Sequence, residues 1–374
     1  MRSSTVAPRL SLTQKIVQTK IIGKALITLV ALAVIYLLTV NAIKNPTVFL
    51  QQLVNGLQLG FVYALIALGY TMVYGIVRLI NFAHGDVFMV GAFVSFYAIS
   101  RIQLHDWVAR LAPGMSPFVA RVIGSITVML LAMVLCAFLA FVIERIAYKP
   151  LRDAPRISAL ITAIGVSFFL EYFGALKFVF SPNFTPYKRP FDVVTWTLGR
   201  QGFGRLIEGQ GVPEGNITFS NIFVIIVLTS ILLLLLLQYI VTKTRVGKAM
   251  RATAYDKPTA RLMGINVDSI ISVTFGIGAA WAGAAGMLYA TAFSQVYFWM
   301  GIIPGLKAFV AAVLGGIGSI PGAFVGALIM GQAEVLSAGY ISTPMRDAVA
   351  FSILIIVLLI RPTGIFGEPS REKA

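Results

Sequence analysis

Long hydrophobic stretches separated by short polar segments make up most of the chain. A helix needs roughly 20 predominantly apolar residues to cross the hydrocarbon of a bilayer. Runs such as ILLLLLLQYIV (231–241) do not alternate apolar and polar positions, as strands of a membrane barrel do. The pattern therefore predicts an all-α polytopic membrane protein with about eight to ten transmembrane helices. The ten candidate crossings, two of them short, are 21–42, 51–75, 80–101, 119–143, 157–180, 219–241, 270–293, 303–318, 321–338 and 346–361.

Composition supports this prediction, since 58% of the 374 residues are hydrophobic and only 12% are charged. The net charge of +16 does not indicate a nucleic-acid partner, because Lys and Arg concentrate between the crossings. Short loops rich in Lys and Arg stay in the cytoplasm. Ten crossings place two basic loops on that side, together with both termini. The basic residues of these loops are Arg145, Lys149, Arg152 and Arg156, then Lys243, Arg245, Lys248, Arg251, Lys257 and Arg261.

The first 50 residues form a segment of their own. Residues 1–24 contain five basic residues and no acidic one, and an apolar stretch that ends in TVNA (39–42) follows. An uncleaved signal-anchor helix is favoured, because the basic region is long for a signal peptide. Cleavage after Ala42 is the alternative. The remaining chain divides into a transmembrane domain at 51–367 and a cytoplasmic tail at 368–374.

A polar segment at 241–270 interrupts the apolar sequence and is rich in basic residues. It predicts two short helices, the first at 246–255. Asp256 and Pro258 mark the start of the second, and Gly264 marks its end, since these residue types suit helix caps and first turns. Two capped helices in tandem indicate a docking element below the membrane. A loop that binds lipid headgroups is the alternative, as polybasic segments often do so.

Two clusters of polar and small residues lie beside apolar crossings. NFAHGD (81–86) supplies Asn81, His84 and Asp86 where one crossing begins, and GGIGSIPG (315–322) separates the eighth crossing from the ninth. Backbone leaves the helix at membrane depth only where it is buried in protein or lines a cavity. Paired interruptions are typical of a translocation path. Two readings stay open for the first cluster: a hydrogen-bonded turn, which is favoured, and a gate or substrate contact.

Other polar residues stand in apolar surroundings, including Gln58, Tyr63, Glu171, Lys307 and Glu334. A structural role is favoured for Glu171. Small residues also repeat at a spacing of four in GIGAAWAGAAGMLYA (276–290), which pairs Ala279 with Gly283 and Ala282 with Gly286. Such spacing lets helices approach closely in lipid.

The sequence predicts no metal site, cofactor or enzymatic activity. Two His and one Cys, widely separated, cannot form a usual transition-metal site. The chain also has no G-x-x-x-x-G-K-[ST] motif, dinucleotide fingerprint or Ser-His-Asp arrangement. Any ATP hydrolysis must therefore occur on a separate chain.

An ordered series of motifs is similar to the permease subunit of a branched-chain amino acid ABC importer. The motifs are NGLQLGFVYALIALGYTMVYGI (55–76), INFAHGDVFMVGAF (80–93), IERIAYKPLR (143–152), GKAMRATAYDKPTARLMGIN (247–266), GLKAFVAAVLGGIGSIPGAFVGALIMGQAE (305–334) and RPTGIFG (361–367). The resemblance implies an ABC importer permease fold with short interrupted helices, in a bacterial inner membrane. It also implies a second permease subunit, two ATPase subunits and a periplasmic binding protein as partners.

The resemblance, read with the motifs, gives two sets of site residues. An ATPase-coupling loop at 243–268 contains Gly247, Arg251, Asp256, Pro258, Arg261 and Gly264. A candidate translocation path or gate contains Gln58, Tyr63, Asn81, His84, Asp86, Gly315, Gly316, Gly318 and Glu334. The expected function is alternating-access import of branched-chain or other neutral amino acids.

Two alternatives remain at this stage. An ion-coupled secondary transporter would use Asp86, Glu171 or Glu334 as its titrating group. A urea or amide permease of the same family would share much of the motif pattern. The capped cytoplasmic helices argue against a secondary transporter or a passive channel, neither of which needs a docking element.

Overall fold

The structure is a computed structural model that describes residues 28, 29, 32–78, 80–152, 154–199, 202–206, 211–361 and 363–367. The chain divides into two compact units, Met1–Gln51 and Gln52–Ala374. In the first unit a short apolar helix runs over Leu32–Lys44. The basic segment 1–24, the start of the crossing expected at 21–42 and the tail 368–374 lie outside the described residues.

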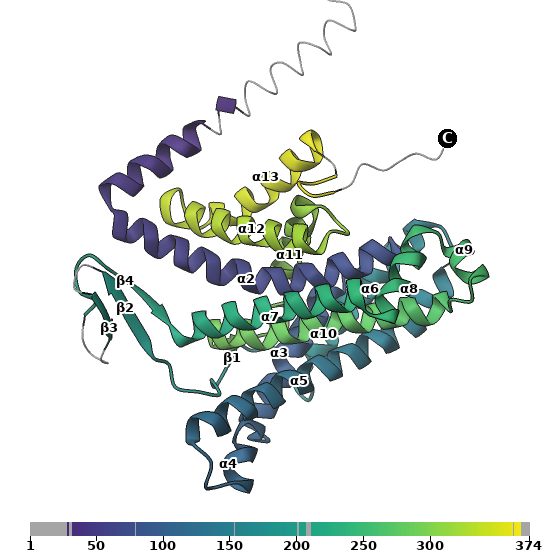
Figure 1. Ribbon diagram of the computed structural model, residues 1–374, viewed down its shortest axis with the longest axis horizontal. Coiled ribbons are helices and arrows are strands. Elements are labelled where there is room, and N and C mark those ends of the chain that lie inside the picture. Colours follow the sequence, from purple (N-terminus) through teal and green to yellow (C-terminus); the bar gives the residue numbers. More distant parts are fainter. Residues whose placement is uncertain are drawn as a thin grey trace, which may run out of the picture. The chain divides into compact units, whose positions relative to one another are not determined.

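The second unit is a bundle of apolar helices, and each of the other nine predicted crossings corresponds to one of them (Figure 1). Among the residues that the structure describes, six helices are long and apolar enough to span a membrane, and α3 with its continuation to Leu111, bent by 58°, is a seventh candidate. This confirms the predicted all-α membrane fold. The helices that correspond to the nine predicted crossings are α2 (Pro46–Val77), α3 (His84–Ser100), α5 (Pro117–Ile143), α6 (Arg156–Gly174), α7 (Asn221–Lys243), α10 (Val267–Phe293), α11 (Ile302–Gly315), α12 (Ile320–Tyr340) and α13 (Met345–Ile360).

Helix α10 packs closely against α3 and α5 in the centre of the bundle. A Cβ on Gly91 of α3 would lie 2.6 Å from the Cα of Gly283. A Cβ on Gly286 would lie 2.6 Å from the backbone nitrogen of Ala92. The predicted close approach at the small residues of this helix is therefore confirmed, and it leaves no room for larger side chains.

The two basic loops lie at the same end of the bundle, as the charge pattern predicted. Figure 1 shows α8 (Arg245–Tyr255) and α9 (Lys257–Leu262) beyond α7 and α10 at this end. The other loop forms two short helical turns, η2 (Glu144–Tyr148) and η3 (Lys149–Leu151). Arg152 after η3 forms ion pairs with Glu144 and with Asp268 of α10, which joins the two loops.

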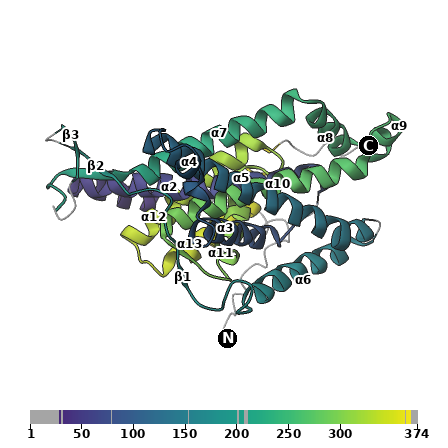
Figure 2. The same cartoon turned by 90° about the horizontal axis from the view of Figure 1, so that it is seen from below.

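The opposite end carries the longer connections and short strands (Figures 1 and 2). The first connection contains η1 (Leu104–Asp106) and α4 (Trp107–Leu111). In the second, β2 (Thr195–Gly199) pairs antiparallel with both β3 (Gly202–Arg205) and β4 (Asn216–Ser220). A separate antiparallel pair joins β1 (Thr185–Pro186) to β5 (Gln295–Val296). The sequence had not predicted these strands.

Candidate functional site

The first element of the predicted coupling loop, α8, is fixed to the end of α7. The Thr244 hydroxyl caps it by accepting a hydrogen bond of 3.0 Å from the Gly247 N–H. Gly247 lies so close to the carbonyls of Ile240 and Val241 that a Cβ would overlap them. Arg251 donates a hydrogen bond to the Val241 carbonyl. These contacts set the direction of α8 relative to the bundle.

The second element, α9, begins and ends where the sequence predicted. Asp256 occupies the N-cap position and Pro258 lies in the first turn. The Asp256 carboxylate accepts a hydrogen bond of 2.7 Å from the Thr259 hydroxyl, and no backbone N–H bonds to it as a cap. Gly264 follows the helix with φ +80°, a conformation that glycine adopts without strain.

Large apolar side chains at the end of these helices face outward. Tyr255, Leu262 and Met263 are 82%, 88% and 77% exposed. Exposed apolar groups next to basic ones are typical of a surface that contacts another protein or a membrane. Arg261 lies between them in sequence, and its guanidinium is 3.8 Å from the Asp268 carboxylate. Gly247, Arg251, Asp256, Pro258, Arg261 and Gly264 thus all belong to one tightly connected element.

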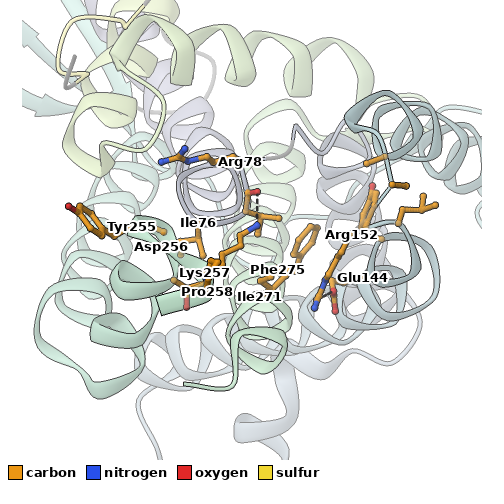
Figure 3. A pocket seen from close by; sticks show the side chains of 17 residues that line it. Ile76, Arg78, Glu144, Arg152, Tyr255, Asp256, Lys257, Pro258, Ile271 and Phe275 are labelled. Atoms are coloured by element: carbon orange, nitrogen blue, oxygen red, sulfur yellow. Dashed lines mark hydrogen bonds and ion pairs between the residues drawn. The ribbon is translucent and has the colours of Figure 1, made fainter. Parts of the chain in front are cut away.

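A cavity of about 380 Å³, the coupling-end cavity, lies between this element, the end of α2 and η2. Figure 3 shows Lys257 reaching toward the end of α2, and its Nζ is 3.5 Å from the Val77 carbonyl oxygen. Burial lowers the pKa of Lys257, and the nearby Arg152, Arg78 and Arg261 lower it further. The cavity therefore brings together positive charges from α2, the η3 loop and α9.

A second cavity of about 440 Å³, the Lys307 cavity, lies among α2, α10, α11, α12 and α13. Lys307 of α11 is its central charge. The Lys307 Nζ is 2.6 Å from Glu334 Oε1 and 2.6 Å from Asp347 Oδ1. Tyr63 donates a hydrogen bond of 2.9 Å to Glu334 Oε2. Arg346 Nε lies 3.8 Å from Glu334 and 3.6 Å from Asp347.

Three residues of the predicted path meet in the Lys307 cavity. Gln58, Tyr63 and Glu334 all line it. The predicted site did not include Lys307, Arg346 or Asp347. Lys307 carries a sequence signal, because a lysine inside an apolar stretch is costly without a role. Arg346 and Asp347 begin a different helix, and no sequence pattern indicates that they reach Lys307.

The polar residues of NFAHGD contact different partners. Helix α2 ends at Val77 and α3 begins at His84, so the interruption is a connection between two helices. Asn81 Oδ1 accepts a hydrogen bond of 2.7 Å from the Tyr148 hydroxyl. The buried His84 ring packs against Tyr70 with ring centroids 4.6 Å apart.

Asp86 faces a third direction, toward α6. Its carboxylate accepts a hydrogen bond from the Ser167 hydroxyl. Both residues line a cavity of about 190 Å³, and Glu171 of α6 faces the same space. Asp86 is therefore separated from the Lys307 cavity, which has a different lining.

The glycines of GGIGSIPG form the turn between α11 and α12. Gly315 ends α11, while Gly316 and Gly318 have φ of +106° and +99°. The N–H groups of Ile365 and Phe366 donate hydrogen bonds of 2.9 Å to the carbonyls of Leu314 and Gly315. The RPTGIFG motif thus provides hydrogen-bond donors for the last carbonyls of α11. The glycines belong to a tight turn between two helices.

Within the described part of the chain, no group of three or more His, Cys, Asp or Glu side chains could hold a metal ion. The chemistry of the two main cavities comes from ion pairs, hydroxyls and apolar walls.

Comparisons with known proteins give a consistent family. The family described as "Branched-chain amino acid transport system / permease component" matches residues 52–358. The permease protein LivH of the high-affinity branched-chain amino acid transport system of Escherichia coli K12 is 42% identical over 331 residues, covering 87% of this chain and 97% of LivH. The corresponding BraD of Pseudomonas aeruginosa is 40% identical over 325 residues, covering 87% and 98%. A probable LivH of Methanocaldococcus jannaschii is 28% identical over 319 residues, covering 81% and 88%.

Proposed function

The chain belongs to the family of branched-chain amino acid transport permease components, and from this premise we propose how its two ends serve import. It is a multi-pass membrane permease of an ABC importer for branched-chain or other neutral amino acids. It is not itself an enzyme. The observation that carries this function is the match of nearly the whole membrane bundle, residues 52–358, to the family. The comparisons give no support to an ion-coupled transporter or a urea permease.

The partners follow from this class of transporter. ATPase subunits and a substrate-binding protein complete the importer, as expected from the resemblance. We propose that two ATPase subunits and a second permease subunit, different from this one, form the membrane assembly. The binding protein is periplasmic, and both termini are cytoplasmic if the first helix is retained. Support for this orientation comes from the basic loops, which share one end of the bundle.

Helices α8 and α9 are the proposed docking element for one ATPase subunit. Their exposed tip, Tyr255, Leu262 and Met263, offers apolar contact area. The base is fixed to α7 through Gly247 and Arg251. A rigid base and an apolar tip would transmit movement of the ATPase to the bundle.

The Lys307 cavity is the proposed outer part of the translocation path. It lies at the end of the bundle opposite to α8 and α9, and it contains Gln58, Tyr63 and Glu334. The coupling-end cavity lies at the other end. Alternating access would open these ends in turn while ATP is hydrolysed on the partner subunits. Asn81, His84, Asp86 and the glycines Gly315, Gly316 and Gly318 then act as supports of the bundle near this path.

The function is tested with the complete importer in proteoliposomes. Uptake of labelled leucine and alanine is measured with the binding protein outside and ATP inside. Uptake should stop when ATP is removed and continue when an ionophore collapses the proton gradient alone. Uptake that survives without ATP and disappears with the gradient would support the secondary-transporter alternative instead.

A further inference from the structure

We propose that the Lys307 cavity is an entry subsite for the charged backbone of an amino acid. Arg346 binds the α-carboxylate and Asp347 binds the α-ammonium group, while Lys307, Glu334 and Tyr63 hold these two residues in position. The inference rests on the proposed function, because it assigns the groups of the permease that first contact its substrate.

The charges of the cavity are balanced. Lys307 and Arg346 carry positive charge, and Glu334 and Asp347 carry negative charge. They interact in an alternating network with nitrogen–oxygen distances of 2.6 to 3.8 Å. A zwitterion carries one charge of each sign. It can therefore replace the ion pair between Arg346 and Asp347 with two ion pairs, one to each residue, and no charge is left unpaired. A substrate with net charge would leave an uncompensated charge in a partly buried site, which is strongly unfavourable.

Exposure divides the network into two layers. The side chains of Lys307 and Glu334 are 1% and 5% exposed, whereas those of Arg346 and Asp347 are 48% and 43% exposed. Both Glu334 oxygens already have partners, Lys307 and Tyr63. A ligand that enters the cavity therefore meets Arg346 and Asp347 first. The inner three residues are positioning residues.

Arg346 suits the carboxylate because its Nε lies 3.6 and 3.8 Å from the acidic members of the network, which is longer than a hydrogen bond. A guanidinium presents a planar fork that matches a carboxylate with two parallel hydrogen bonds. Asp347 lies next to it in sequence and supplies the acceptor for an ammonium group. Asp347 Oδ1 is 3.6 Å from Arg346 Nε and both residues line the cavity, so the two charged ends of one amino-acid backbone can reach them together.

The rest of the cavity lining is uncharged. Asn55, Gln58, Tyr289 and Tyr297 add polar groups to it, and its aliphatic side chains would contact the substrate side chain. Its volume of about 440 Å³ lies in the range of small-molecule sites, roughly 300 to 1,000 Å³. The lining offers aliphatic surface for a branched side chain and no further charge. The aliphatic residues are Leu59, Val62, Ala292, Ile303, Pro304, Val335 and Ala338.

Uptake by the complete importer is the first test. Arg346→Gln and Asp347→Asn should each lower leucine uptake by at least about tenfold, since each removes one partner of a substrate charge. The matched control is another arginine–aspartate pair, Arg121 and Asp192, with an Arg side chain that is also 48% exposed. Arg121→Gln and Asp192→Asn should leave uptake near the wild-type rate. Co-purification of the ATPase subunits checks assembly of every variant.

A binding assay separates substrate contact from a structural role. Tritiated leucine is bound to the purified permease–ATPase assembly without the binding protein, and two competitors are added. Leucinamide keeps the ammonium but lacks the carboxylate, and 4-methyl-2-oxopentanoate keeps the carboxylate but lacks the ammonium. The wild type should prefer leucine over both competitors. Arg346→Gln should no longer prefer leucine over leucinamide but should still prefer it over the oxo acid. Asp347→Asn should no longer prefer leucine over the oxo acid but should still prefer it over leucinamide.

Two outcomes would overturn the subsite while the importer still transports leucine: no leucine binding by the wild-type assembly, or variants that keep the wild-type order of competitors. Absence of ATP-dependent leucine uptake by the wild-type importer would instead contradict the proposed function.

Discussion

Lys307 and Glu334 form an ion pair between α11 and α12, with Lys307 Nζ 2.6 Å from Glu334 Oε1. Both side chains are almost completely buried, at 1% and 5% exposure. Charges leave water at a high cost and tolerate burial only when they are paired and hydrogen-bonded. Tyr63 and Asp347 provide the additional partners. The network therefore holds four helices together through groups that depend on one another.

Lys307→Met should strongly destabilise the protein. It would leave Arg346 as the one remaining cation of this network beside the two carboxylates of Glu334 and Asp347, and loss of one partner of a buried pair costs about 3–5 kcal/mol. The double variant Lys307→Met with Glu334→Gln should lose less stability, because it removes one positive and one negative charge and leaves Arg346 paired with Asp347. Unfolding is followed with a thiol-reactive dye, because Cys136 is buried and is the only cysteine in the chain.

The exposed pair Arg121 and Asp192 serves as the control for this cycle. Its removal should change stability by less than about 1 kcal/mol, as is usual for surface ion pairs. Additive effects of the Lys307 and Glu334 substitutions would contradict the coupling that the geometry implies.

Gly264 gives a test of the docking element that involves backbone conformation alone. Its φ is +80°, and no atom lies within 4 Å of the position where a Cβ would be. Gly264→Asn should retain docking, because Asn tolerates the left-handed region. Gly264→Val should weaken ATPase association and leucine uptake, since a β-branched residue there is strained by at least about 1–2 kcal/mol. Equal co-purification of the ATPase with both variants would rule out this role of the turn.

The membrane helices and the two short helices α8 and α9 could be predicted because their signals are local. Backbone groups inside a bilayer must be satisfied within each helix, so hydropathy alone locates the crossings. Pro258 and Gly264 mark the ends of α9, because proline suits a first turn and glycine adopts the positive φ that follows the helix. The meeting of Lys307 with Asp347 could not be predicted, because it depends on how α11, α12 and α13 pack.

The partners of the polar residues in NFAHGD could not be predicted from their closeness in sequence. His84 and Asp86 are two positions apart on α3, and residues at that spacing point to different sides of a helix. His84 contacts Tyr70 of α2, whereas Asp86 contacts Ser167 of α6. The sequence identified polar residues that need partners, but only the helix packing shows that the partners differ.

Lys257 should be replaceable without loss of stability at neutral pH. Burial and then Arg152, Arg78 and Arg261 lower its pKa, so its charge opposes folding. Lys257→Met should therefore unfold at the same temperature as the wild type or slightly above it. The folded-state pKa lies below the unfolded one, so wild-type stability gains as pH rises between them. The difference in unfolding temperature between Lys257→Met and the wild type should therefore become smaller toward pH 10. The same thiol-reactive dye measures it.

A contrary result for Lys257 is equally clear. A Lys257→Met protein that is less stable than the wild type at neutral pH would mean that the contact with the Val77 carbonyl outweighs the repulsion. Arg251→Met serves as the comparison, because Arg251 donates to the Val241 carbonyl and its loss should destabilise the end of α7.

Substitutions of Asp86 distinguish a supporting role in the helix bundle from a role in gating. Its carboxylate accepts a hydrogen bond from Ser167, which links α3 to α6. Asp86→Asn keeps the size of the side chain and an oxygen that can accept this bond. If the residue is a support, the Asn variant should assemble and take up leucine within about threefold of the wild-type rate, well under 1.4 kcal/mol in activation free energy.

Removal of the acceptor should have the opposite effect. Asp86→Leu leaves the Ser167 hydroxyl without this partner in a partly buried position, at a cost of about 1–3 kcal/mol. It should lower the unfolding temperature and the yield of assembled importer, and Ser167→Ala in the same background should restore part of both, because the orphaned donor is then gone.

A gate would behave differently. Its carboxylate would change partners between the two access states, so Asp86→Asn would still assemble and hydrolyse ATP while leucine uptake fell at least about tenfold. Simultaneous measurement of ATP hydrolysis and uptake in proteoliposomes distinguishes the two roles, and uncoupled hydrolysis in the Asn variant would assign Asp86 to the gate.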